Sequence, residues 1–264
     1  MKQIILIILF TTSIFAQSSK MLLLMDDEYL PLTITANTSN YIIDDGGVTY
    51  FFRVAGIAGK TFKVDWGDGT ISQITFIGAT TDQRIAKTYT NAGTYNVKIY
   101  GWDYVTRLLW QNWNAGAFNL QKLPAGLTYL NLFSIGTNIT GSISSLLTKL
   151  TYLRLHTLGT NITGSISSLP AELTDLYLIN IGNNIDITTG TMPAWGSTAI
   201  IIAPQSGYGY KTAQIDGFLN AWALTAASGT RTINLTGANQ PRSSASDAAV
   251  TILTGLGKTI LTNP

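Results

Sequence analysis

The sequence predicts a mainly β protein in three parts: an N-terminal β-sandwich, a short solenoid of stacked coils and a C-terminal α/β cap. Three observations support this fold class. Short β-branched and aromatic runs alternate with Gly, Asn and Asp from about residue 30 to residue 101. A leucine pattern then recurs at a fixed spacing, and residues 211–264 carry apolar residues at helical spacing.

The composition narrows the function classes before any motif is considered. Only 11% of the 264 residues are charged, against about 25% in a typical soluble domain. Sixteen basic and fourteen acidic residues leave a net charge of +2, which is too small and scattered to hold a nucleic acid. The absence of Cys and the single His exclude disulfides, thiolate metal sites and multi-imidazole zinc sites. We therefore expect an uncharged extracellular protein without a cofactor.

Residues 1–16 have the pattern of a cleavable signal peptide. Met1-Lys2 is followed by an apolar run, residues 4–10, that is too short to span a bilayer, and Ala16 precedes a polar stretch. A retained apolar strand or anchor is the alternative. Residues 17–29 would form a linker or strand, and the mature chain, without a membrane span, would be secreted or displayed on the cell surface.

Residues 30–102 are predicted to form the sandwich. Its strands are expected in the runs Tyr50–Val54, Phe62–Val64, Ile71–Ile77 and Tyr95–Tyr100. Asp68-Gly69 is a tight-turn dipeptide, and Trp66 is expected to fill the space between the two sheets.

Two motifs of this segment resemble a known family. Residues 65–70 (D-W-G-D-G-T), with Lys87-Thr88-Tyr89 and residues 93–99, resemble the PKD domain, an immunoglobulin-like sandwich of bacterial and archaeal surface proteins. Lys87 stands where the family usually has His. The resemblance implies a spacer or adhesion module without catalysis. Four acids of the segment are weak calcium candidates, because carboxylates suit Ca²⁺, although an Asp in a turn commonly serves the turn: Asp44, Asp45, Asp65 and Asp68.

Residues 103–210 contain an internal repeat. The pattern L-x-x-L-x-L begins at Leu127, Leu150 and Leu173, with steps of 150 − 127 = 23 and 173 − 150 = 23 residues. Weaker copies begin at Val105 and continue at Ala199-Ile-Ile201. A fixed period of this length predicts a solenoid in which each coil places one strand beside the previous one.

These coils resemble leucine-rich repeats. The segments 138–146 and 161–169 both read N-I-T-G-S-I-S-S-L, which resembles the second-strand consensus of the plant-type subclass. In this chain Asn138 comes six residues after the last Leu of the strand, rather than three, so the turn that leaves the strand is longer. The resemblance implies a leucine-rich-repeat solenoid with a ligand face.

Residues 211–264 are predicted to close the solenoid with two helices. Ile215, Phe218, Leu219, Trp222 and Ala226 share one helical face. Ser244-x-x-Asp247 resembles a capping box for a second helix through Val250 and Leu253, with strands expected at residues 232–235 and 258–262.

Residues between the leucines of each coil should point outward and form columns across neighbouring strands. The expected columns are Arg107, Tyr129, Tyr152 and Asp175; Leu109, Asn131, Arg154 and Tyr177; and Gln111, Phe133, His156 and Ile179. Tyr and Arg concentrate binding energy, so nine of these residues form the candidate ligand-binding face: Arg107, Tyr129, Asn131, Phe133, Tyr152, Arg154, His156, Asp175 and Tyr177. The alternative is that the aromatic columns only stabilise the sheet.

Three functional hypotheses follow. The first is a non-catalytic extracellular or cell-surface adhesion protein whose leucine-rich-repeat face binds a protein or polysaccharide. The second is a structural virion protein, a fibre or decoration of a bacteriophage, for which a homo-oligomer is possible. The third and most remote is a glycan-active enzyme, because no two acids recur at equivalent column positions for paired-carboxylate chemistry. A Ser-His-Asp triad is equally remote, because His156 and its nearest column acid, Asp175, lie on different coils and in different columns.

Overall fold

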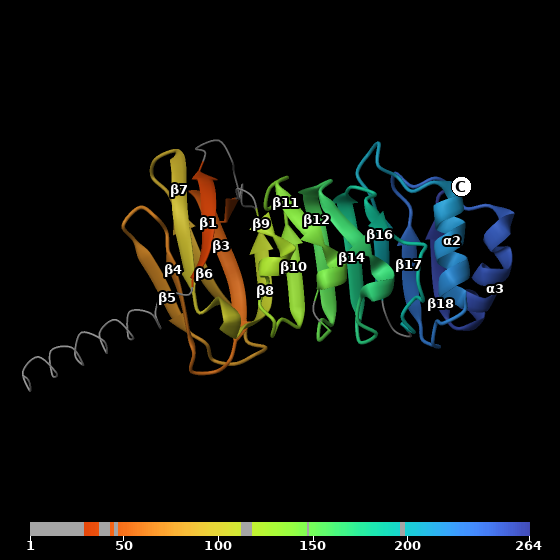
Figure 1. Cartoon of the computed structure of the whole chain (residues 1–264), viewed down its shortest axis with the longest axis horizontal. Helices are drawn as coiled ribbons and strands as arrows, with labels where there is room; N and C mark the ends of the chain where they lie inside the picture. The colour runs from red at the N-terminus through yellow and green to blue at the C-terminus, as the bar shows by residue number, and fades with distance from the viewer. Residues whose placement is uncertain (1–28, 37–42, 45–46, 112–117, 147, 196–198) are drawn as a thin grey trace, which may run out of the picture.

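The computed structural model describes residues 29–36, 43–44, 47–111, 118–146, 148–195 and 199–264. The protein is mainly β, with several sheets, and two α-helices lie in the described C-terminal region (Figure 1). The strands are β1 Tyr29–Ala36, β2 Ile43–Asp44, β3 Gly47–Gly56, β4 Thr61–Asp65, β5 Ile71–Thr75, β6 Gln83–Thr88, β7 Gly93–Tyr100, β8 Val105–Gln111, β9 Phe118–Asn119, β10 Tyr129–Phe133, β11 Ile139–Ser142, β12 Tyr152–Gly159, β13 Ile162–Ser165, β14 Asp175–Ile181, β15 Ile185–Asp186, β16 Ala199–Ala203, β17 Arg231–Leu235 and β18 Lys258–Thr262. The helices are α2 Thr212–Ala223 and α3 Asp247–Gly255, and short 3₁₀ segments are η1 Trp102–Tyr104, η2 Leu120–Lys122, η3 Ile143–Ser145, η4 Ile166–Ser168 and η5 Ser244–Ser246.

One sheet of ten strands, counted over the described residues, runs along the molecule in the order β18-β17-β16-β14-β12-β10-β8-β3-β2, with β6 paired to β3. The strands from β8 to β18 are parallel, whereas β3 pairs with β8 in the antiparallel sense. The sheet therefore continues across the predicted boundary at residues 102 and 103, and the buried side chains on both sides of it form one core cluster.

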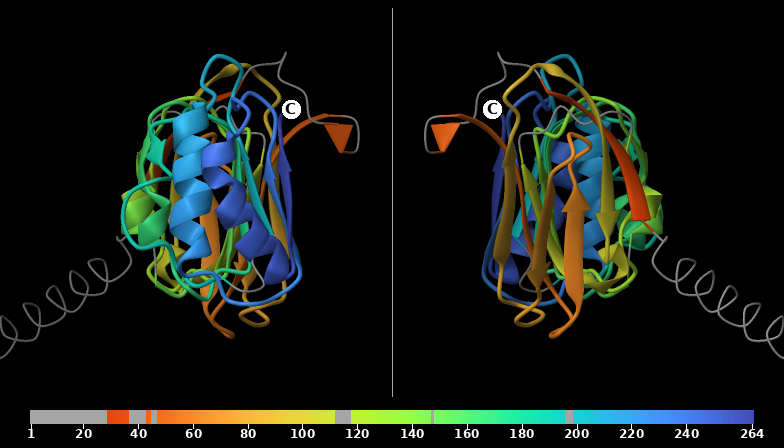
Figure 2. Two further views of the ribbon diagram at one scale, coloured as in Figure 1. Left: turned by 90° about the vertical axis from the view of Figure 1, so that its right-hand side faces the viewer. Right: turned by 90° about the vertical axis from the view of Figure 1, so that its left-hand side faces the viewer.

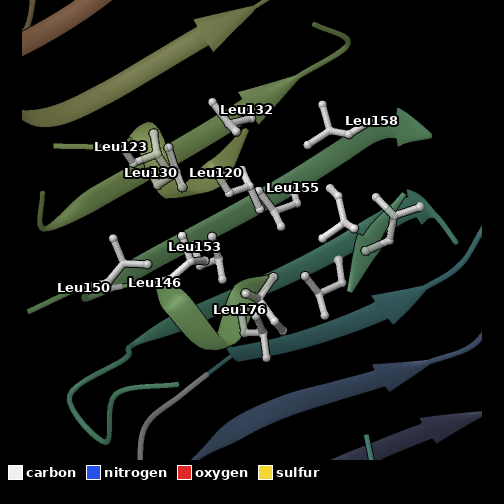
Figure 3. Close-up of a cluster of buried hydrophobic side chains, with 14 of the residues drawn as sticks. Leu120, Leu123, Leu130, Leu132, Leu146, Leu150, Leu153, Leu155, Leu158 and Leu176 are labelled. Carbon is white, nitrogen blue, oxygen red and sulfur yellow. The ribbon is translucent and has the colours of Figure 1, made fainter. Parts of the chain in front are cut away.

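The leucines of the repeat line the inner side of this sheet. Leu130, Leu153 and Leu176 are aligned on neighbouring strands and fully buried. A smaller parallel sheet, β15-β13-β11-β9, carries buried apolar residues such as Ile139 and Ile162. Figure 3 shows the leucines gathered over the strands and the short helical turns. The alternation of Leu with polar residues thus creates a strand with one apolar side.

The step between coils changes at β16. Leu176 is aligned with Ile200 and Leu178 with Ile202, so this step is 200 − 176 = 24 residues. A constant step of 23 residues would align Leu176 with Ala199 and Leu178 with Ile201, so the weaker copy predicted at residues 199–201 is displaced by one residue and Ile201 lies on the outer side. The physical reason is one additional residue in the connection after β15, whose Met192 and Trp195 are buried in the core.

A residue with left-handed backbone conformation lies at or near the C-terminal end of each central strand of the repeat. Ser134, Thr157 and Asn180 have φ of 50°, 55° and 50°, a conformation that is uncommon for residues other than Gly. The register between β12 and β14 shifts at the same place, between His156 and Gly159. The repeated asparagines, at positions 138, 161 and 184, are exposed, and the Asn184 side chain donates to the Thr160 carbonyl.

The 3₁₀ turns η2, η3 and η4 each begin after a residue whose side chain caps the turn, and this capping residue recurs at the same place in each repeat. Asn119, Ser142 and Ser165 each accept a hydrogen bond from the backbone N–H two residues ahead, which satisfies a donor that the turn leaves free. Gly164 has φ of 106°, and a Cβ there would lie 2.4 Å from the Ser142 Oγ. Only glycine suits this close approach between coils.

The N-terminal strands pack as two layers. The sheet β1-β7-β4-β5 lies against β3, where the Phe52 and Phe62 rings are 6.0 Å apart. Trp66 is fully buried as expected, and the Tyr89 hydroxyl donates to its carbonyl at 2.8 Å. The strand predicted at residues 71–77 ends earlier, at Thr75.

The C-terminal helices cover the inner side of the last strands (Figure 2). Ile215, Phe218, Leu219 and Trp222 of α2 are buried as predicted, whereas Ala226 lies beyond the end of the helix. The strands predicted at residues 232–235 and 258–262 correspond to β17 and β18.

The predicted capping box is wrong. Ser244 belongs to η5, and α3 begins at Asp247, whose carboxylate pairs with Arg242 at 2.5 Å. The buried carboxylate of Asp216 decides this junction, because it accepts hydrogen bonds from the hydroxyls of Ser243 and Ser246, each at 2.6 Å.

Within the described ranges, neither α-helix has the length and apolar character needed to cross a bilayer. The proposed signal peptide and most of residues 17–29 lie outside the described residues, so these two expectations stay predictions.

Candidate functional site

The site is the outer face, which we define as the side of the ten-stranded sheet opposite the leucines. The register places all nine candidate residues on it, in the three predicted columns. Arg107, Tyr129, Tyr152 and Asp175 are aligned across β8, β10, β12 and β14, as are Leu109, Asn131, Arg154 and Tyr177, and Gln111, Phe133, His156 and Ile179.

The first column is a continuous stack of planar groups. The Arg107 guanidinium lies 4.1 Å from the centre of the Tyr129 ring, and this ring stacks on Tyr152 at 4.2 Å with an angle of 13° between the planes. Asp82 holds Arg107 in place through a 3.0 Å ion pair. Burial and the neighbouring Tyr129 raise the pKa of Tyr152 to about 12. Both faces of the Tyr129 ring are therefore occupied, so Tyr129 presents its ring edge and hydroxyl group to a ligand.

Asp175 ends this column, and its carboxylate is engaged. It accepts hydrogen bonds from the Tyr177 hydroxyl at 3.0 Å and from the Thr174 hydroxyl at 2.9 Å. Burial, followed by the contact with Asp175, raises the pKa of Tyr177. The hydroxyl of Tyr177 therefore keeps its proton at neutral pH and remains a donor.

The third column contains the single imidazole. The His156 ring stacks on Phe133 at 4.4 Å, and its Nδ1 lies 2.7 Å from the Thr157 hydroxyl. Burial and then the charge of Arg154 lower the pKa of His156, so the ring is neutral at pH 7. Among the described residues its side-chain hydrogen-bond partner is Thr157, whereas the Asp175 carboxylate contacts Thr174 and Tyr177.

The middle column corrects one expectation. Asn131 points outward but is only 4% exposed, because larger side chains on its own and neighbouring strands cover it. Its Oδ1 and the Nε of Arg154, the residue aligned with it on β12, are both buried and find no hydrogen-bond partner among the described residues. The Arg154 guanidinium also lies 5.4 Å from the centre of the Phe133 ring. The centre of the outer face therefore holds two polar groups whose hydrogen-bonding capacity is not used.

Two cationic residues of the outer face were missed. Arg53 of β3 is aligned with Leu109, and Arg84 of β6 is aligned with Arg53. Phe52 and Val54 are buried, so Arg53 between them points outward, and the alternation of apolar and polar residues in the sequence could have indicated this. The sequence could not indicate the pairing of β3 with β8, which places Arg53 beside the columns.

The structure describes the side chains of two of the four calcium candidates, Asp65 and Asp68. Asp65 accepts a hydrogen bond from the Gly67 N–H, and Asp68 accepts from Thr70 and forms a 2.5 Å ion pair with Lys87. The side chain of Asp44 and all of Asp45 lie outside the described residues. These hydrogen bonds place Asp65 and Asp68 in their turns. Among the side chains that are described, no group of three acidic or imidazole ligands gathers.

We expect the ion pair of Asp68 to make stability depend on pH. Burial opposes ionisation of this carboxyl, but hydrogen bonds from Lys87 and Thr70 outweigh it and lower the pKa of Asp68 from 3.8 to about 2. A carboxyl with a lowered pKa contributes stability that is complete above pH 3.8 and is lost as the pH falls towards 2. In urea unfolding, Asp68→Asn should therefore destabilise the protein at pH 5 and have little effect near pH 2. An equal loss at both pH values would contradict this prediction.

Comparisons with protein-family models, with curated proteins and with solved structures find no match for the chain. The function therefore has to be inferred from the chemistry of the outer face. This face is broad and formed by a regular sheet, and it combines tyrosine hydroxyls with arginine side chains.

Proposed function

We propose that this protein is a non-catalytic extracellular or cell-surface binding and adhesion protein, and that the outer face is its ligand-binding surface. The observation that supports this most strongly is the alignment of Tyr129, Tyr152, Arg154 and Tyr177 on adjacent parallel strands. Tyr and Arg are enriched where binding energy concentrates.

The arrangement also suits binding because it is ordered before a ligand arrives. The stacking of Tyr129 on Tyr152 and the hydrogen bond from Tyr177 to Asp175 restrict these side chains in the free protein. Side chains that are already ordered lose less conformational entropy on binding. The regular strands also fix the distances between these side chains before a ligand binds.

We further propose that the architecture is an immunoglobulin-like sandwich followed by a leucine-rich-repeat solenoid with a C-terminal α/β cap. The 23-residue alignment of Leu130, Leu153 and Leu176 supports the solenoid. The antiparallel pairing of β3 with β8 supports a sandwich that caps the N-terminal end, and the packing of α2 and α3 supports a cap at the other end.

A triple change of Tyr129, Tyr152 and Tyr177 to Ser tests the proposed surface. We expect it to abolish attachment to host cells, polysaccharide or partner protein, because hot-spot residues contribute about 2 kcal/mol or more each. The fold should persist, since none of the three side chains lies among the core leucines; the loss of cross-strand pairs costs less than about 1 kcal/mol per pair. Attachment is measured with protein whose circular dichroism matches the parent.

The matched control is the double change of Tyr104 and Tyr208 to Ser. Both residues are exposed tyrosines outside the outer face, so attachment should be unchanged. If the folded triple variant attaches like the parent, the outer face is not the binding surface and the aromatic columns have only a structural role.

A further inference from the structure

The centre of the outer face holds a buried acceptor and a buried donor on neighbouring strands. Asn131 of β10 is aligned with Arg154 of β12, and Asn131 is only 4% exposed. The Asn131 Oδ1 and the Arg154 Nε find no hydrogen-bond partner among the described residues. A buried polar group without a partner opposes folding. A ligand that supplies partners for these two atoms would therefore be bound favourably.

The guanidinium of Arg154 can turn towards such a ligand. It lies 5.4 Å from the centre of the Phe133 ring, and a contact of this kind is weak at a partly exposed residue such as Arg154. The side chain starts on β12 and reaches a ring on β10, so it passes beside Asn131. When Arg154 turns outward, it therefore breaks no hydrogen bond at Nε and uncovers the amide of Asn131.

The charge of Arg154 favours an anionic ligand group. Asp175 on the neighbouring strand β14 is already engaged, because its carboxylate accepts hydrogen bonds from the hydroxyls of Tyr177 and Thr174. A guanidinium pairs most strongly with a carboxylate or a phosphate, which it contacts through two parallel N–H groups. The first requirement on the ligand is therefore an anionic oxygen group.

Asn131 sets a second requirement, which is a donor close to the anionic group. An amide Oδ1 only accepts hydrogen bonds, and neighbouring strands lie about 4.8 Å apart. A hydroxyl one or two carbons from a carboxylate spans this distance. Tyr152 and Tyr177, which flank Arg154 on its own strand and on β14, offer hydroxyls to further hydroxyl groups of the ligand. A sugar acid meets these requirements together.

We propose that Arg154 and Asn131 form a binding site for one sugar-acid unit of a glycan: the guanidinium binds the carboxylate, and the Asn131 Oδ1 accepts a hydrogen bond from a neighbouring hydroxyl. This inference rests on the proposed function and names the ligand chemistry at the centre of the same surface. A peptide C-terminus fits less well, because bound peptides commonly pair with a free strand edge, and β10, β12 and β14 are each paired on both sides.

Titration of the full chain with small ligands, followed by proton NMR, tests the inference. The imidazole of His156 is the single one in the chain and lies on the same strand and the same face as Arg154, so its signal reports on this site. The probes are D-galacturonate, its uncharged methyl ester, D-galactose and N-acetyl-L-alanine. The site variants are Arg154→Gln and Asn131→Leu. The matched controls, Lys122→Gln and Asn161→Leu, change exposed residues outside the outer face.

We expect D-galacturonate to shift the His156 signal to saturation and to bind at least about tenfold more tightly than its methyl ester or D-galactose, which cannot form the charge-assisted hydrogen bonds. Arg154→Gln should weaken binding by at least about tenfold for the same reason. Asn131→Leu should weaken it by about threefold or more, because one acceptor is lost. The fold should persist in Asn131→Leu, since the change removes a buried acceptor without a partner, and both controls should stay within about twofold of the parent.

Three results would overturn the inference: equal affinity for D-galacturonate and its methyl ester, unchanged affinity of the folded Arg154→Gln variant, or tighter binding of N-acetyl-L-alanine than of D-galacturonate. If no probe binds but the tyrosine triple variant still loses attachment to cells, the ligand chemistry is wrong while the proposed binding surface stands.

Discussion

Leu153→Ala is expected to lower the free energy of unfolding by about 2 to 5 kcal/mol. Leu153 is fully buried on β12 and aligned with Leu130 and Leu176 on the strands to either side. Truncation leaves a cavity that neighbouring coils cannot fill, because their own leucines are fixed by the same strand pairing. Urea or thermal unfolding monitored by circular dichroism measures the loss.

Leu224→Ala provides the matched control. Leu224 follows α2 and is 84% exposed, so the same chemical change should alter stability by no more than about 0.5 kcal/mol. A loss this small at Leu153 would mean that the proposed stacking of the coils is wrong.

Trp66→Ala should lower the free energy of unfolding by about 3 to 5 kcal/mol through its place between the N-terminal strands. The indole is fully buried, and its Nε1–H donates to the Ser72 hydroxyl at 2.8 Å. Its backbone carbonyl accepts the hydrogen bond from Tyr89, so loss of the ring should also weaken the contact between the segments around Trp66 and Tyr89. The measurement is the same unfolding experiment.

The comparison variant for Trp66 is Ile71→Ala on β5. Ile71 is 61% exposed, so its truncation should change stability only slightly. Equal effects of the two changes would show that Trp66 does not fill the interior between the N-terminal strands.

The repeat and its columns could be predicted because they depend on local periodicity. A strand alternates its side chains, and parallel strands separated by a constant number of residues must align equivalent positions. Tyr129, Tyr152 and Asp175 follow from these two rules alone. Where the number of residues between strands changes, as between Leu176 and Ile200, a constant repeat length places the next strand one residue too early.

The remaining features depend on contacts between residues far apart in the chain, which periodicity does not encode. The sequence alone determined which residues of each coil point inward and which point outward. Only the tertiary structure decided that β3 pairs with β8 and brings Arg53 beside Leu109, that Asp216 positions the start of α3, and that Asn131 is covered by its neighbours. The physical reason is that strand pairing, side-chain burial and ring stacking are set by the three-dimensional neighbours of a residue, whereas its direction from the sheet is set by its position in the strand.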